Sequence, residues 1–182
     1  MKISKLLSLL LLSLCCINVY ADERLYKIEL VIFSQEMPNT EVFDQTESRI
    51  AWPRQRYLVK RAEYEEVSPE DMNLDGSFAQ LARVQDYQAL MYVAWIQPVK
   101  ENRLSTAVQI SNTDGTINGF FRLQRGHLVH MIADIEYSPE LYEDSVIYRL
   151  NEKRRFKLNE THYLDHPKFG ILARVSPISS SE

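Results

Sequence analysis

Cysteine is almost absent from this 182-residue sequence, because Cys15 and Cys16 are the only two and both lie within the first 21 residues. The other 161 residues therefore cannot form a disulfide framework, a cysteine nucleophile or a thiolate zinc site. A chain of that length can bury one sizeable core without cross-links. We expect one domain over residues 22–176 and a flexible, serine-rich tail over residues 177–182.

Long apolar runs are also missing, except near the N-terminus. Lys2 and Lys5 precede an apolar stretch over residues 6–17, and the segment ends on the small residue Ala21. This order of features predicts a cleavable signal peptide over residues 1–21, and hence an exported protein. An uncleaved membrane anchor is the alternative, but the apolar stretch is shorter than the roughly 20 residues that span a bilayer.

Lipid attachment at Cys15 or Cys16 is a further alternative for the N-terminal segment. Both cysteines stand at the end of the apolar stretch, where a lipidated cysteine would be found. The residue before Cys15 is Leu14, however, whereas a lipobox has a small residue at that place. The signal peptide with cleavage after Ala21 is therefore the preferred interpretation.

The exported part also lacks a positive charge excess. Since Lys2 and Lys5 belong to the signal segment, 19 Lys and Arg stand against 25 Asp and Glu in the rest of the chain, for a formal net charge of −6. A globally acidic protein is poorly suited to binding nucleic acid. We therefore expect no nucleic-acid partner.

Glycine is scarce, and the motifs that depend on it are absent. The chain has five glycines and contains neither a glycine-rich phosphate loop nor a Gly-x-Ser-x-Gly nucleophile motif. Neighbouring carboxylates such as Glu65 with Glu66, or Glu70 with Asp71, lie in polar sequence typical of solvated loops, whereas acid–base catalysis needs a cleft. We therefore expect neither enzymatic activity nor a cofactor.

The sequence is rich in strand-like alternation. Apolar and polar residues alternate over residues 26–33, which predicts a half-buried strand, and over residues 129–137. Residues 89–99 are apolar on both faces, which is typical of a central strand. Further strands are expected over residues 104–110, 116–124, 146–158 and 169–175. Short turns between them indicate an α+β fold, mainly an antiparallel sheet with meander connections and one or two short helices packed on it.

Three other local signals complete the prediction of the fold. Asp114 and Gly115 predict a tight hairpin turn. Ser77 is expected to cap a short helix. Residues 34–75 form a long, polar and irregular connection, which the apolar segment over residues 50–53 is expected to anchor to the core.

The four histidines were considered as metal ligands. His127 and His130 are three residues apart in a predicted strand, so they point to opposite faces. His162 and His166 have the spacing of two ligands on one helix face, but Pro167 disfavours helical dihedrals at His166. In an extended chain these two would lie about 13 Å apart. No metal site is therefore predicted, and a metal-dependent hydrolase that uses His162 and His166 stays as an alternative.

Basic and aromatic residues are concentrated in one stretch of this acidic chain. Its members are Tyr148, Arg149, Lys153, Arg154, Arg155, Phe156 and Lys157. Guanidinium groups bind carboxylates in bidentate fashion, and aromatic rings offer flat faces for sugars. A glycan that carries acidic lactyl and peptide groups would suit such a stretch. The alternative is a solvated edge strand whose charges prevent aggregation.

The sequence resembles the CsiV family in a long C-terminal motif. Residues 151–172, NEKRRFKLNETHYLDHPKFGIL, resemble the family signature, which joins a double arginine to a Glu-x-His-Tyr-Leu-Asp-His-Pro-x-Phe-Gly segment. Residues 26–33 resemble the opening strand of the family, residues 94–98 resemble its central strand, and residues 128–130 match in part. The middle loop over residues 35–75 departs from the pattern.

This resemblance implies a small periplasmic protein that binds peptidoglycan in a Gram-negative envelope. It implies a non-enzymatic accessory role in wall synthesis and cell shape, as an assistant of an LpoA-type outer-membrane lipoprotein that activates a class A penicillin-binding protein. It supplies no catalytic residue and no list of ligand contacts.

The ligand contacts that we predict come from side-chain chemistry alone. They are Arg154, Arg155, Tyr163 and His166. His162, Asp165 and Pro167 would equally well form a structural corner. A pure protein–protein adaptor, which makes its contacts through residues 35–75, is the remaining alternative.

Overall fold

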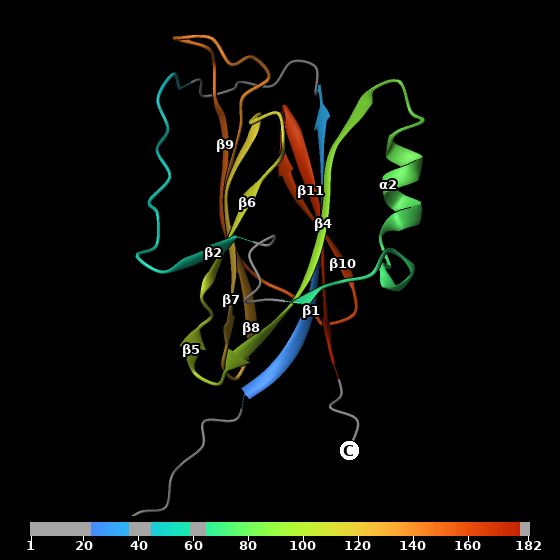
Figure 1. Ribbon diagram of the computed structural model, residues 1–182, viewed down its shortest axis with the longest axis vertical. Coiled ribbons are helices and arrows are strands. Elements are labelled where there is room, and N and C mark those ends of the chain that lie inside the picture. The colour runs from blue at the N-terminus through green and yellow to red at the C-terminus, as the bar shows by residue number, and fades with distance from the viewer. Residues whose placement is uncertain (1–22, 37–44, 59–64, 179–182) are drawn as a thin grey trace, which may run out of the picture.

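The computed structural model describes residues 23–36, 45–58 and 65–178, and it contains two β-sheets that face each other (Figure 1). The predicted signal peptide, the alternative lipid sites at Cys15 and Cys16, and the last four residues of the predicted tail lie outside the described residues. No helix among the described residues is long and apolar enough to cross a bilayer.

The first sheet has the strand order β10–β11–β1–β4–β3, and every pairing in it is antiparallel. Its strands are β1 (Glu23–Gln35), β3 (Glu65–Glu66), β4 (Tyr87–Lys100), β10 (Thr161–His166) and β11 (Phe169–Pro177). The N-terminal strand β1 thus lies between the C-terminal strand β11 and β4. This sheet brings the two ends of the domain together.

The second sheet has the order β2–β6–β7–β8–β9, and β5 pairs with β7 beside it. Its strands are β2 (Arg56–Leu58), β5 (Arg103–Leu104), β6 (Ala107–Ser111), β7 (Ile117–Arg125), β8 (Val129–Tyr137) and β9 (Tyr148–Arg155). Strands β6 to β9 follow one another as the predicted meander, whereas β2 pairs with β6 in parallel. The antiparallel sheets and the small helical content confirm the predicted fold class.

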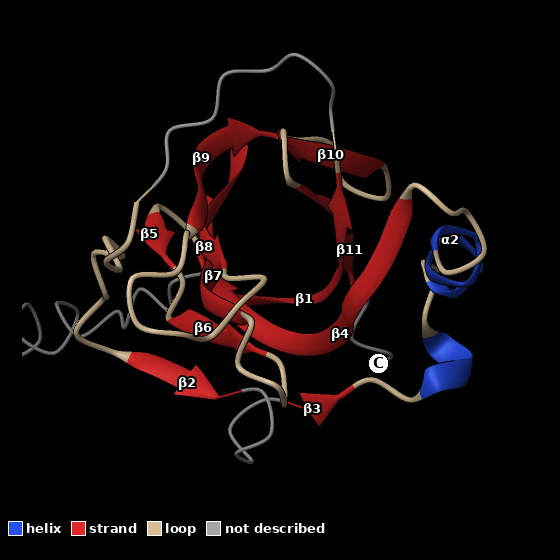
Figure 2. Ribbon diagram, turned by 90° about the horizontal axis from the view of Figure 1, so that it is seen from above, coloured by secondary structure: helices blue, strands red, loops and turns tan. Residues whose placement is uncertain are grey.

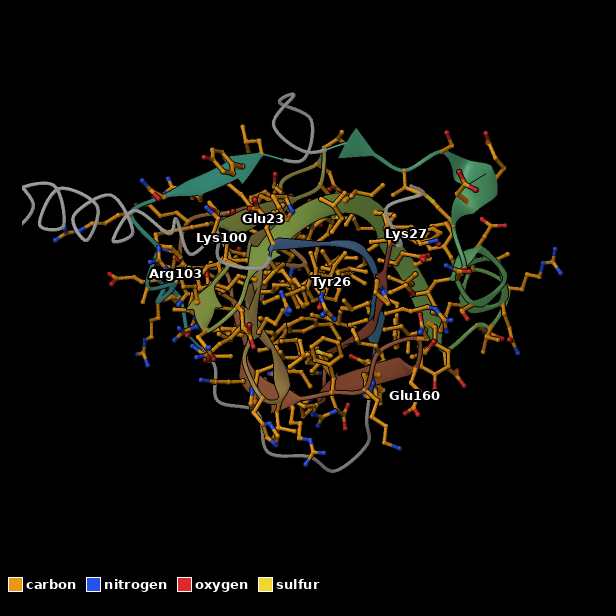
Figure 3. The ribbon with its side chains drawn as sticks, turned by 90° about the horizontal axis from the view of Figure 1, so that it is seen from below. Glu23, Tyr26, Lys27, Lys100, Arg103 and Glu160 are labelled. Carbon is orange, nitrogen blue, oxygen red and sulfur yellow. The ribbon has the colours of Figure 1, made fainter. Side chains whose placement is uncertain are left out.

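The main hydrophobic core fills the space between the two sheets. Seen from above, the strands curve around a common interior (Figure 2), and the view from below shows side chains, including Tyr26, filling it (Figure 3). The core joins buried residues of both sheets, such as Trp95 and Ile171 of the first and Phe121 and Met131 of the second. Period-two alternation in each strand supplies these inward side chains.

Strand β1 is buried on both faces, so the prediction of a half-buried strand is wrong. Its inner residues face the main core, while Val31 and Phe33 on the other face lie under a helical cover. That cover consists of Leu74 and helix α2 (Asp75–Leu81), which the short 3-10 helix η1 (Pro69–Asp71) precedes in the chain.

Helix α2 begins differently from the prediction. Its N-cap is Leu74, whose side chain makes no capping hydrogen bond, so Ser77 lies inside the helix and does not cap it. Leu74 is buried against Val31 and Phe33. The start of the helix is therefore fixed by packing on the first sheet and by the Glu29 carboxylate of β1, which accepts hydrogen bonds from the Asn73 and Leu74 backbone nitrogens.

The middle of the chain has more regular structure than the sequence indicates. Within the predicted irregular connection, the structure places β2, β3 and η1. The expected anchor is confirmed, because Ile50 and Trp52 pack against Ala107 and Phe120 of the second sheet. The strand predicted over residues 104–110 is instead two strands, β5 and β6, with Ser105 between them.

Candidate functional site

The edge strands of the two sheets, β9 and β10, meet along a seam that contains Arg154. The Arg154 guanidinium donates a hydrogen bond to the backbone oxygen of Tyr163 (2.6 Å) and forms an ion pair with Glu152 (2.7 Å). A charge-assisted bond of this kind is stronger than a neutral one. Arg154 therefore ties one sheet to the other.

Arg154 and Arg155 point to opposite sides of β9. Arg154 lies opposite the buried Met131 on β8, and Arg155 lies opposite His130 on the outer side of the sheet. Neighbouring residues of a strand alternate between its faces. The two arginines that the sequence analysis treated together therefore occupy different surfaces.

The Tyr163 hydroxyl belongs to a polar network at the end of β10. It donates to Asp165 Oδ1 (2.7 Å) and accepts a hydrogen bond from Gln35 Nε2 (2.7 Å), and burial together with the bond to Asp165 raises the pKa of Tyr163 to about 12. Its ring stacks on Phe33 (6.1 Å between centroids). A side chain at Gly170 would collide with both rings, so Gly170 is what lets them approach.

The His166 ring is half-buried among other rings. It lies 5.9 Å from Tyr148 and 5.0 Å from Phe169, measured between centroids. Its Nδ1 accepts a hydrogen bond from the Lys168 backbone (3.2 Å), which leaves the proton of the neutral ring on Nε2. Burial lowers the pKa of His166, and the nearby Asp165 opposes this only in part. At neutral pH the ring is an uncharged packing group.

The β10 geometry argues against a shared metal at His162 and His166. Both side chains face the core side of one strand, four residues apart, which separates them by about 13 Å. Zinc needs ligand nitrogens about 2 Å from the ion. His162 Nε2 is instead within 3.2 Å of the Lys157 backbone nitrogen and 3.0 Å of its oxygen. Among the described residues there is no group of three or more His, Cys, Asp or Glu that could hold a metal ion.

Lowering the pH should destabilise the protein through His166. The unfolded ring binds a proton near pH 6.5, and the folded ring binds it only at lower pH, so the unfolded state holds more protons in that window. The contribution of His166 is complete above about pH 6.5 and declines as the pH falls below it. The free energy of unfolding, measured with urea, should therefore fall more between pH 7.5 and pH 5.5 for the wild type than for His166→Asn. The asparagine side-chain oxygen can still accept the hydrogen bond from the Lys168 backbone. Equal losses would contradict this role.

The outer side of the second sheet, away from the core, carries a second group of cations. In the register of β7, β8 and β9, Arg122 is level with Lys153, and Gln124 is level with His130 and Arg155. We call these five residues the basic face. Lys153 donates a hydrogen bond to Gln124 across the sheet (2.7 Å). Arg122 has no signal of its own in the sequence, because only the strand register brings it beside the cations of β9.

Two acids on the same side of the sheet have their hydrogen-bonding partners within the protein. Arg149 forms a bidentate pair with Asp134 (2.7 and 2.8 Å), and these hydrogen bonds raise the pKa of Arg149. Glu136 accepts from Gln45 Nε2 (2.7 Å) and from the Arg49 backbone (2.8 Å). Both carboxylates are nearly inaccessible. They do not compete for the side chains of the basic face.

Aromatic and guanidinium groups lie next to the basic face. Trp52 packs on Phe120 with 6.1 Å between ring centroids, and Arg56 lies 4.7 Å from the centre of the Trp52 ring. Arg122 lies 5.7 Å from the centre of the Phe120 ring. A stacked guanidinium group can offer its terminal nitrogens to a planar anion. Arg56 Nε donates to Gln109 Oε1 (3.4 Å), and Arg122 Nε is buried.

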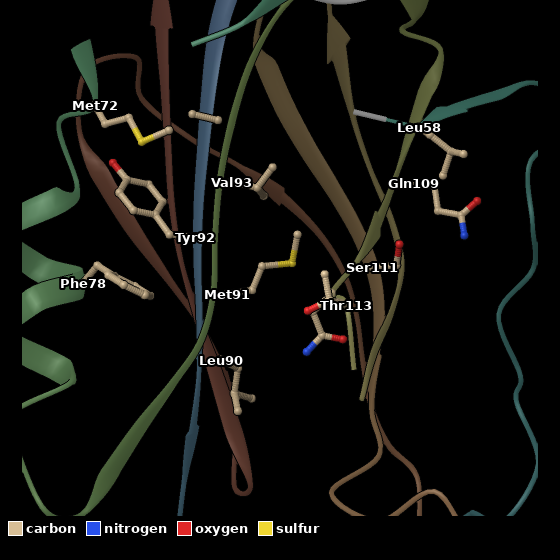
Figure 4. A pocket seen from close by; sticks show the side chains of 12 residues that line it. Leu58, Met72, Phe78, Leu90, Met91, Tyr92, Val93, Gln109, Ser111 and Thr113 are labelled. Carbon is tan, nitrogen blue, oxygen red and sulfur yellow. The ribbon is translucent and has the colours of Figure 1, made fainter. Parts of the chain in front are cut away.

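A groove of about 520 Å³ lies between β4 and β6 (Figure 4). Its described lining is uncharged and includes Phe78, Leu90, Met91 and Gln109. Such a lining provides no cation for an acidic glycan. The groove therefore does not account for the chemistry predicted from the basic stretch.

Comparison with known proteins gives one match. The family model described as "Peptidoglycan-binding protein, CsiV" matches residues 5–178, nearly the whole chain. No curated protein and no solved structure matches it. The match contains every element of both sheets and every predicted site residue. The chain belongs to the CsiV family of peptidoglycan-binding proteins.

Proposed function

We propose that this protein is exported to the periplasm and acts there as a non-enzymatic accessory of cell-wall synthesis. In this proposal it binds peptidoglycan and assists an LpoA-type lipoprotein that activates a class A penicillin-binding protein, and so supports cell shape. The family match carries the binding role. The N-terminal segment, with its lysines, apolar stretch and Ala21, supports the periplasmic location.

The surface chemistry agrees with a binding role. Three cations that form no ion pair within the described residues, Arg122, Lys153 and Arg155, lie close together on the outer side of one sheet of an otherwise acidic protein. An open sheet surface suits an extended polymer, whereas small-molecule sites are concave and mostly apolar. The His162 and His166 geometry described above gives no support to the alternative of a metal-dependent hydrolase.

Co-sedimentation with isolated sacculi tests the proposal. The chain from Asp22 onward should sediment with sacculi at low salt, and sodium chloride should release it if ionic contacts contribute. Added LpoA-type lipoprotein should be retained in the pellet to a greater extent when the chain is present. A chain that stays in the supernatant at low salt would count against wall binding, and an unchanged amount of lipoprotein would count against the assisting role.

A further inference from the structure

We propose that the basic face is the wall-binding surface and that it recognises the carboxylate groups of the peptidoglycan polymer. This inference rests on the proposed function and names the site that performs it. It reassigns the ligand contacts predicted from the sequence: Arg155 stays, whereas Arg154 is a positioning residue of the seam and Arg122 and Lys153 are added.

The cations of this face are not committed elsewhere. Lys153 and Arg155 are exposed, and Lys153 contacts only the neutral amide of Gln124. Arg122 lies over Phe120, and within the described part of the chain its guanidinium forms no ion pair and its buried Nε has no acceptor. Arg154, by comparison, is held by Tyr163 and Glu152.

The spacing of the cations favours a repeating anion over a single one. Alternate residues of β9 place Lys153 and Arg155 about 7 Å apart, and two strand spacings place Arg122 about 10 Å from Lys153. No single carboxylate can reach all three side chains. A polymer that carries many carboxylates can engage them together, and each further contact then raises the avidity without a new binding pocket.

The charge pattern of the face also separates it from the rest of the molecule. The sheet carries its two outer acids, Asp134 and Glu136, toward one end, where Arg149 and the segment from Gln45 to Arg49 satisfy them. Toward the other end, this side of the sheet carries Arg122, Lys153 and Arg155. An acidic polymer is therefore attracted to that end although the protein as a whole is negative.

Two triple variants with the same change in net charge test the proposal. Arg122→Gln, Lys153→Gln and Arg155→Gln together neutralise the basic face. Arg83→Gln, Lys100→Gln and Arg103→Gln together neutralise three exposed cations outside it. We expect sacculus binding to fall about tenfold in the first variant and less than about twofold in the second. Thermal unfolding should show that both variants remain folded.

A second arm identifies the group that is recognised. Sacculi whose carboxylates have been converted to amides should bind the wild-type protein about as weakly as native sacculi bind the basic-face variant. Unchanged binding to amidated sacculi would overturn carboxylate recognition.

The outcomes separate this inference from the proposed function. If the wild type fails to sediment with sacculi, the proposed function fails. If all three proteins sediment equally, wall binding stands and the basic face is not its site. If neutralising the basic face abolishes binding to anionic phospholipid vesicles but leaves sacculus binding unchanged, the face is a membrane surface and the inference is wrong.

Discussion

Replacing Gly119 with alanine should destabilise the protein by about 3 kcal/mol or more, because the new methyl group has no space. Gly119 lies in the middle of β7, paired with Ile110 on one side and Ile135 on the other. A Cβ atom at this position would overlap the backbone oxygen of Asp134 and lie 2.6 Å from the Cα of Ile135.

The obstacle at Gly119 is backbone, so side-chain repacking cannot remove it. Relief would require β7 and β8 to separate, and these two strands form the centre of the second sheet. Their separation would break ladder hydrogen bonds and open the core at Phe121 and Met131. Urea unfolding of Gly119→Ala against the wild type measures the loss.

Gly76→Ala is the matched control for this prediction. Gly76 lies in α2, and a Cβ atom there would meet nothing within 4 Å. Alanine suits a helix better than glycine, so this variant should be as stable as the wild type or more stable by about 0.5–1 kcal/mol. Similar stabilities for the two variants would show that β7 and β8 tolerate the added carbon.

The fold could be predicted where one strand carries its own signal. In β8, Met131, Ala133 and Ile135 occupy alternate positions, with His130, Asp134 and Glu136 on the other face, and the structure buries all three apolar residues in the core. The prediction failed at β1, because a residue such as Val31 is buried by α2, which comes from a distant part of the sequence. Strand β10 was not predicted, because Thr161–His166 contains only one aliphatic residue. Its extended conformation depends on the pairing with β11.

At the candidate site, too, some features could be predicted from the local sequence, and others depend on residues far apart in the chain. The opposite faces of Arg154 and Arg155 follow from period-two alternation once β9 is known to be a strand. The closeness of Arg122 to Lys153 depends on the register of three strands, which no local pattern reveals. The family motif was a sound guide to membership, yet His162, Tyr163, Asp165 and His166 all make contacts within the domain. These contacts support a structural role for the motif, which is the alternative stated for His162, Asp165 and Pro167.

Replacing Glu29 with alanine should also cause a large loss, about 3 kcal/mol, because four donors converge on its buried carboxylate. Oε2 accepts from the backbone nitrogens of Asn73 (2.7 Å) and Leu74 (3.1 Å) and from the Tyr92 hydroxyl (2.8 Å), and Oε1 accepts from Asn73 Nδ2 (2.6 Å). Leu74 is the N-cap of α2, so this carboxylate of β1 fixes the start of the helical cover.

The protonation of Glu29 shows how strong this arrangement is. Burial acts to raise the pKa of Glu29, but the hydrogen bonds from Asn73, Tyr92 and Leu74 outweigh it and the pKa is lowered. The unfolded state therefore binds its proton first as the pH falls. The stability that Glu29 provides is complete above about pH 4.5 and is lost as the pH falls through the lower folded value. This pH range lies below the one over which the contribution of His166 is lost.

Urea unfolding at pH 7 of Glu29→Ala, Glu29→Gln and Glu140→Ala tests the role of this carboxylate. Glutamine keeps one acceptor oxygen but points its NH2 group at other donors. The Glu29→Gln variant should therefore lose about 1–2 kcal/mol of stability, which is less than the loss in Glu29→Ala. Glu140 is exposed, and its replacement should change the stability by less than about 0.5 kcal/mol. In Glu29→Ala, backbone amides of α2 should lose their protection from hydrogen exchange before those of the sheet, since the sheet beneath α2 keeps its own core contacts. If Glu29→Ala kept the wild-type stability and the α2 amides stayed protected from exchange, the prediction would be wrong. Packing of Leu74 on Val31 and Phe33 would then be enough to hold α2 on the sheet.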